Sequence, residues 1–179
     1  MSSKLSIPTV LLHWVVGLAF IGVFALGLYL EELAQGPEKF ELMGIHKSIG
    51  LGILLIALLR ISWRLKEGHL ARLTHAPAWQ EWLAKGVHFI LLFATIMMPI
   101  SGLVMSYGSG RAIEFFGIEL LAAGDKIEWL SEIGHTFHGV APKLIMLAFA
   151  LHIIGAIKHQ FIDKDGTISR MLGRSVTLK

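Results

Sequence analysis

The chain of 179 residues contains no cysteine. This absence excludes disulfide bridges, thiolate metal sites, iron–sulfur clusters and haem attached covalently through a C-x-x-C-H motif. Charged residues are also scarce, at 16%, whereas 54% of the residues are apolar and the mean hydropathy is +0.66. Such a composition is too apolar for an ordinary soluble domain. The sequence therefore predicts a membrane protein without cysteine chemistry.

Four apolar segments are each long enough to cross a bilayer, which requires about 20 residues of helix. They lie at about 10–30, 43–63, 86–107 and 137–158, and none shows the alternation typical of strands. The first segment lacks a small-residue cleavage site, so we expect a retained span rather than a removed signal peptide. The loops are too short for a second domain. We therefore expect an all-α, integral membrane four-helix bundle that forms one domain, residues 1–179.

The charges predict how the bundle is oriented. Eleven of the sixteen basic residues lie in the N-terminus, the loop between the second and third segments with its flanks, and the C-terminus. An excess of Lys and Arg marks the cytoplasmic side, so we expect both termini in the cytoplasm. The pI near 9.3 then reflects topology and not a nucleic-acid partner. The second outer loop, about 108–136, mixes aromatic, aliphatic and acidic residues, which predicts short amphipathic helices on the outer leaflet.

The nine histidines include two pairs at matched depths. His138 and His152 are fourteen residues apart on the fourth segment, so they share a helix face to within about 40° and differ in depth by about 21 Å. With both termini inside, His46 lies at the outer depth of His138 and His13 at the inner depth of His152. Two imidazoles that face each other across a bundle suit axial ligation of a flat metal macrocycle such as haem.

Neighbouring residues fit the same interpretation. Gly17 and Gly50 follow His13 and His46 by four residues, on the same helix face, and leave room for a porphyrin. Arg60 at the inner depth, and Lys143 with Lys47 at the outer depth, are candidates to bind the propionates. Three alternatives stay open: the histidines are hydrogen-bonding core residues, the glycines serve helix packing and the arginines anchor the cytoplasmic face. A compact zinc or nickel site built from the same histidines is a further alternative.

The other histidines have less definite roles. His88, at the inner end of the third segment, could replace His13 or His152 as a ligand or hydrogen-bond a substrate. His159 follows His152 by seven residues on the same face, and could either touch a ligand beneath the inner haem or lie among lipid headgroups. We expect His69 and His75 in a solvated loop.

Taken in order, several motifs resemble the bacterial four-helix, dihaem cytochrome b561 family over nearly the whole chain. They are LLHW at 11–14, IHKSIG at 45–50, PISGLVMSY at 99–107, the pair His138 and His152, and KHQFIDKDGTISRML at 158–172. The resemblance implies two b-type haems, held by His13 with His152 and by His46 with His138. It also implies a location in the bacterial inner membrane. The implied reaction is electron exchange between the periplasmic face and ubiquinone, with superoxide as the electron donor in one type of member. Related b subunits instead anchor a separate dehydrogenase, which is the alternative function.

The family pattern also suggests where the quinone binds and raises one difficulty. His159 is the candidate for the quinone hydrogen bond, with Arg64 or Trp63 nearby, and no residue is expected to act as a catalytic acid in the interior. The periplasmic side holds nine acids against five bases, although positive charge would steer superoxide. Lys47, Arg111, Lys126 and Lys143 could still gather over the outer haem, or the acids could dock a basic electron-donor protein. A monomer and a homodimer both stay open.

Overall fold

The computed structural model describes residues 2–68, 73 and 76–177, so the predicted loop histidines His69 and His75 lie outside the described residues. Four long helices form the bundle: α1 Ile7–Glu32, α2 Pro37–Glu67, α3 Ala78–Gly108 and α4 Glu128–Ile157. All four are long and apolar enough to cross a membrane, which confirms the predicted membrane four-helix bundle. The last helix continues into a π-helical turn, η1 Lys158–Ile162, which is followed by the short helix α5 Thr167–Met171.

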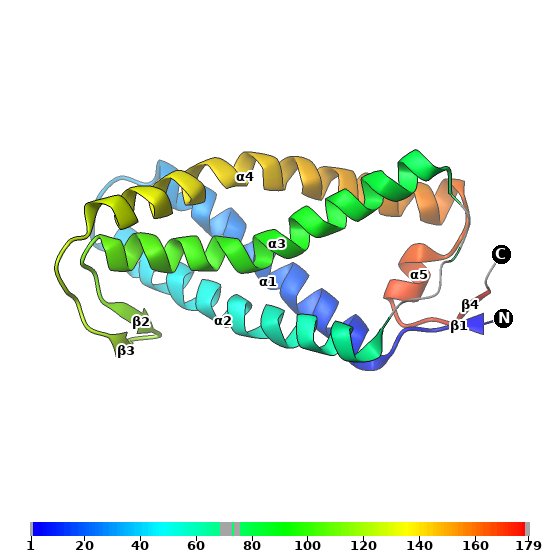
Figure 1. Ribbon diagram of the computed structural model, residues 1–179, viewed down its shortest axis with the longest axis horizontal. Coiled ribbons are helices and arrows are strands. Elements are labelled where there is room, and N and C mark those ends of the chain that lie inside the picture. Colours follow the sequence, from blue (N-terminus) through cyan, green and yellow to red (C-terminus); the bar gives the residue numbers. More distant parts are fainter. Residues whose placement is uncertain (1, 69–72, 74–75, 178–179) are drawn as a thin grey trace.

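The bundle has two distinct ends (Figure 1). At one end, strand β1 Ser2–Ser3 pairs antiparallel with β4 Val176–Thr177 close to both chain termini, and we call this the terminal end. At the opposite end, β2 Ile113–Phe115 pairs antiparallel with β3 Ile118–Leu121, and we call this the hairpin end. The two termini therefore lie on the same side of the membrane, and a cytoplasmic location for that side stays a prediction.

The predicted helix boundaries were too narrow. Every helix begins earlier than expected, most of all α3 at Ala78 and α4 at Glu128. Hydropathy marks only the part of a helix that lies in hydrocarbon, whereas the hydrogen-bonded backbone continues into the polar interface on either side. As a result, His138 lies ten residues inside α4 rather than near its start.

The prediction of short amphipathic helices in the loop 108–136 was wrong. Residues 113–121 form the β2–β3 hairpin, and residues 128–136 are the first turns of α4 rather than a separate helix. The segment IEFFGIELL places acids between apolar residues with the two-residue period of a strand. Its turn residues Phe116 and Gly117 have φ of 48° and 82°, as a type I′ hairpin turn requires.

A close helix contact joins α3 and α4 near the hairpin end. A Cβ added at Gly134 would lie 2.5 Å from the backbone nitrogen of Met105, and one added at Gly108 would lie 2.4 Å from that of Ser131. The two glycines therefore let the helix backbones touch, which is a common way to pack helices in a membrane. This contact holds α4, and with it His138, against α3.

Candidate functional site

The histidines predicted at the outer depth lie side by side near the hairpin end. The rings of His46 on α2 and His138 on α4 have centres 6.2 Å apart, with an angle of 79° between the ring planes. An imidazole nitrogen lies about 2 Å from a metal that it binds and about 1 Å from the centre of its own ring. Two imidazoles on opposite sides of one metal ion therefore have ring centres about 6 Å apart. The spacing of this pair fits axial ligation of a haem iron.

The hydrogen bonds of His138 favour ligation through Nε2. Its Nδ1 lies 3.1 Å from the carbonyl oxygen of Met98 and 2.9 Å from the Oγ of Ser101. Donation of the Nδ1 proton to that carbonyl leaves the lone pair on Nε2, and metal-binding histidines are usually held in this way. The Nδ1 of His46 is buried. The backbone carbonyl of Val23 on α1 lies within reach of the ring of His46 as an acceptor.

Two glycines that the sequence analysis missed make room for these rings. A Cβ added at Gly27 of α1 would lie 3.1 Å from the Cε1 of His46, and one added at Gly102 of α3 would lie 3.4 Å from the Cε1 of His138. Spacing within one helix could not reveal them, because each faces a histidine on a different helix. The predicted glycines Gly17 and Gly50 have open space where a side chain would project. Their role beside a porphyrin stays a prediction.

The histidines predicted at the inner depth lie nearer the terminal end and form a group of three. The ring centres of His13 and His152 are 6.3 Å apart, with the rings tilted by 55°. His88 on α3 also lies against His152, with ring centres 5.3 Å apart. The first separation matches the spacing of about 6 Å derived above and the second is shorter. His13 with His152 is therefore the better-fitting pair, and His88 stays a neighbour of the site.

Arg60 lies at this same depth, as its position on α2 predicts. Its Nη2 is 3.2 Å from the Nδ1 of His13, so the guanidinium donates a hydrogen bond to the ring. In this arrangement a neutral His13 carries its proton on Nε2. Ligation through Nε2 therefore requires Arg60 to turn away, toward an acceptor such as a carboxylate. The position fits the predicted role of Arg60 near the propionates.

An apolar core separates the two histidine pairs. Ala94, Met98 and Ile145 are buried there, and Phe20, Phe24 and Ala141 pack against them. The rings of Phe20 and Phe24 stack on α1 with centres 6.2 Å apart. Along α4, the separation between His138 and His152 is about 21 Å, because the rise is about 1.5 Å per residue. The candidate site thus consists of two separate pairs rather than one compact cage.

No group of three or more His, Cys, Asp or Glu side chains is placed to hold a metal ion within residues 2–68, 73 and 76–177. The alternative of a compact zinc or nickel site therefore has no donor set in the described part of the chain.

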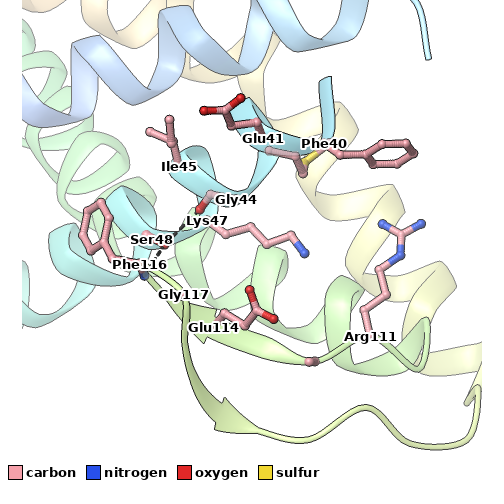
Figure 2. A pocket seen from close by; sticks show the side chains of 12 residues that line it. Phe40, Glu41, Gly44, Ile45, Lys47, Ser48, Arg111, Glu114, Phe116 and Gly117 are labelled. Carbon is pink, nitrogen blue, oxygen red and sulfur yellow. Dashed lines mark hydrogen bonds between the residues drawn. The ribbon is translucent and has the colours of Figure 1, made fainter. Parts of the chain in front are cut away.

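A pocket at the hairpin end brings two of the four suggested cations together (Figure 2). It has a volume of about 640 Å³, and Lys47 and Arg111 line it together with Glu114. In Figure 2 the Lys47 side chain extends toward Arg111. The backbone N–H of Phe116 donates to the Oγ of Ser48 at 2.9 Å, which fastens the hairpin to α2 beside this pocket. Lys47 follows His46 in the chain, but His46 does not line the pocket, because one residue turns the side chain by about 100° around α2.

Two other predicted cations lie elsewhere. Lys126 contacts Glu128, with its Nζ 3.3 Å from a carboxylate oxygen. Lys143 is exposed on α4, and the five-residue step from His138 turns it about 140° away around the helix. Its predicted role toward a propionate stays a prediction, and no contact supports it.

The residues predicted to bind quinone are not brought together. Arg64 donates hydrogen bonds to Glu67 at 2.8 Å and to the carbonyl oxygen of Gly68 at 2.7 Å, at the end of α2. The indole nitrogen of Trp63 donates to the Oγ1 of Thr9 on α1 at 3.1 Å. His159 instead contacts acids that follow it in the chain. The two groups share one end of the bundle, but these contacts do not join them.

Comparison with known proteins shows similarity over almost the whole chain. Residues 4–174 match the model of the family described as prokaryotic cytochrome b561. The chain is 30% identical to cytochrome b561 homolog 2 of Escherichia coli, over 91% of this chain and 88% of that protein. It is 24% identical to the probable superoxide oxidase CybB of Yersinia pestis, over 96% and 97%. It is also 26% identical to cytochrome b562 of Cereibacter sphaeroides, over 90% of each.

Proposed function

The chain belongs to the prokaryotic cytochrome b561 family, and we propose that it carries electrons from a donor at the hairpin end to ubiquinone at the terminal end. Family membership makes it a multi-pass bacterial membrane protein that transfers electrons with b-type haem. We further propose that the chain binds two haems, that superoxide is the electron donor and that a quinone is the electron acceptor. It also places the termini in the cytoplasm and the protein in the inner membrane.

The observation that carries the proposal is the presence of two histidine pairs with nearly equal spacing at two depths. Their ring centres are 6.2 Å and 6.3 Å apart, and α4 contributes one histidine to each pair. His46 with His138 would hold one haem, and His13 with His152 the other. When bound, the haems supply one-electron oxidation and reduction near each end of the bundle. The chain sets the distance between them and keeps water out of the core.

At the hairpin end, the pocket residues would attract the donor. Lys47 and Arg111 place two cations in the pocket, and Glu41 and Glu114 line it as well, so the lining carries no net charge. The proposal therefore relies on direct contact of superoxide with these two cations and not on long-range steering. Two superoxide anions would each lose one electron to become dioxygen. One quinone would gain these two electrons and two protons to become quinol.

At the terminal end, Arg60 and His159 would act on different partners. Arg60 lies against His13 and offers a guanidinium for a propionate. His159 lies two helical turns beyond His152 and would hydrogen-bond a quinone carbonyl. Superoxide as the electron donor is suggested by the probable superoxide oxidase of Yersinia pestis, which is 24% identical to this chain.

The acidic hairpin end favours one alternative. Nine of the thirteen acids are predicted on that side, against five bases, which suits docking of a basic electron-carrier protein or a dehydrogenase. In that case the chain is a membrane anchor with the same haems but without turnover of small donors. The two functions differ in whether the purified chain reacts with superoxide by itself.

The test starts from the purified protein in detergent. A reduced-minus-oxidised spectrum with pyridine haemochrome quantitation should give two b haems per chain, and one haem or none would contradict the proposal. Superoxide generated enzymatically should then reduce ubiquinone, in an amount that superoxide dismutase abolishes. Two haems without superoxide-driven reduction would favour the anchor.

A further inference from the structure

A buried serine of α3 lies against the ring of His138, although ligation of a metal by that ring does not require it. The Oγ of Ser101 is 2.9 Å from the Nδ1 of His138, and its hydroxyl donates to the carbonyl oxygen of Met98 at 2.8 Å. Ser101 is only 6% exposed. A polar side chain at such a position is costly unless its hydrogen bonds are made. The contacts of the hydroxyl therefore indicate its role.

These contacts fix the direction of each hydrogen bond. The carbonyl oxygen of Met98 lies 3.1 Å from the Nδ1 of His138, and a carbonyl oxygen can only accept. The ring proton is therefore on Nδ1. Because the proton of Ser101 points to Met98, the Oγ of Ser101 is free to accept from Nδ1 as well. The Nδ1–H of His138 is thus shared between two oxygens, and the lone pair for a metal is on Nε2.

A simpler role for a buried helix hydroxyl is to bond a carbonyl of its own helix. Thr95 on α3 does so: among the described residues its hydroxyl bonds only the carbonyl oxygen of Leu92, three residues earlier, at 2.8 Å. Ser101 makes the same bond three residues back, to Met98, at the same distance. It differs because its oxygen also meets a histidine on another helix. That second contact is not needed for the bond within α3.

One turn of α3 approaches the His138 ring from one side. Met98, Ser101 and Gly102 share a helix face, because they are three and four residues apart. A Cβ added at Gly102 would lie 3.4 Å from the Cε1 of His138, the carbon between the two ring nitrogens. The lack of a side chain at Gly102 therefore lets the ring come close enough to reach Ser101.

The terminal-end pair has the opposite polarity at its histidine. There the guanidinium of Arg60 donates to the Nδ1 of His13 at 3.2 Å, whereas the Nδ1 of His138 faces acceptors. An acceptor on the N–H of an axial imidazole raises the basicity of the nitrogen that binds the metal. A more basic ligand favours the oxidised iron, so it lowers the reduction potential of a haem. An effect of Ser101 should therefore be confined to the haem of the hairpin end.

We propose that Ser101 is a positioning residue that lowers the reduction potential of the hairpin-end haem through the Nδ1–H of His138. This inference rests on the proposed function, in which His46 and His138 hold that haem. The hydroxyl proton points to Met98, so the negative end of the O–H dipole faces the imidazole. A lower potential at the hairpin end favours passage of the electron onward to the terminal end.

The test is a potentiometric titration of the haem absorption in the full chain. Ser101→Ala should raise the equilibrium constant for reduction of one haem about threefold to tenfold, the range expected for one neutral hydrogen bond. Tenfold corresponds to about 59 mV for one electron. Ser101→Cys should shift the potential in the same direction, because sulfur is only a weak acceptor. Both variants should keep the wild-type haem content.

Two controls identify the haem and the cause. The shift should persist in the His13→Ala background, which should keep only the hairpin-end haem, and should be absent in the His46→Ala background. Thr95→Val is the matched control, because it removes a buried hydroxyl from the same helix that bonds only Leu92. It should leave both potentials unchanged.

The outcomes separate the two proposals. A wild-type chain without two haems refutes the proposed function, and this inference falls with it. With two haems present, an unchanged or lowered potential in Ser101→Ala refutes the inference alone, as does an equal shift in Thr95→Val. If Ser101→Ala loses haem, Ser101→Cys decides the question, because the thiol fills the site. Haem loss in both variants would assign Ser101 to haem binding and refute its role in the potential.

Discussion

Replacement of His138 by alanine tests the assignment of the hairpin-end pair. His138 faces His46 with ring centres 6.2 Å apart, and its Nδ1 bonds the carbonyl oxygen of Met98. If these two histidines hold one haem, the variant should bind one haem per chain instead of two. His46→Ala should lose the same haem, so the spectra of the two variants should coincide.

The structure also indicates that the variant will fold. The lost hydrogen bond to Met98 is worth about 1 kcal/mol. Its carbonyl oxygen keeps the hydroxyl of Ser101 as a donor at 2.8 Å, so no buried acceptor is left unpaired. The close contact of α3 with α4 at Gly134 is untouched. Haem content, measured by pyridine haemochrome against protein concentration, is therefore a readout of ligation rather than of unfolding.

The matched control is His135→Ala, one turn earlier on α4. His135 is exposed, so its loss should leave both haems in place. Full haem content in His138→Ala would refute the ligand assignment. Equal haem loss in the two variants would refute the reasoning from position, because only one of the rings faces His46.

Three further expectations follow from the contacts. Gly134→Leu should lower stability by about 1–3 kcal/mol in thermal unfolding, because the first added carbon would lie 2.5 Å from the Met105 nitrogen. His88→Ala should keep the full haem content, whereas loss of one haem would make His88 a ligand. The lowered pKa of Asp163 means that its hydrogen bond with Lys158 is present at neutral pH and is lost as pH falls below the ordinary carboxyl range, near pH 4. Hydrogen exchange in residues 158–165 should therefore rise only at acid pH.

The number of spans and the two depths of histidine could be predicted from local information. Span length depends on bilayer thickness, and the fourteen-residue step from His138 to His152 depends on helix geometry. Charge asymmetry then relates the depths of different helices, which placed His46 with His138 and Arg60 with His13. The structure brings these residues together.

The loop helices and the grouping of the quinone residues were predicted wrongly because more than one sequence pattern applied to the same residues. The loop 108–136 is amphipathic, but the alternation in IEFFGIELL favours a strand, and the turn at Phe116 and Gly117 closes the hairpin. Arg64 shares a depth with His159, yet Glu67 holds it at the end of α2. A common depth therefore did not imply a common site.

By itself the sequence predicted a four-span membrane bundle, the pairing by depth of His13 with His152 and of His46 with His138, and the family, because these depend on composition, helix period and local motifs. Only the tertiary structure decided which surfaces meet across helices. It placed Gly27 and Gly102 against the histidine rings, made His88 a third neighbour of the inner pair and set His159 between two carboxylates. Rotation about each helix axis and close approach are set by packing between segments that are distant in the chain, and no local spacing encodes them.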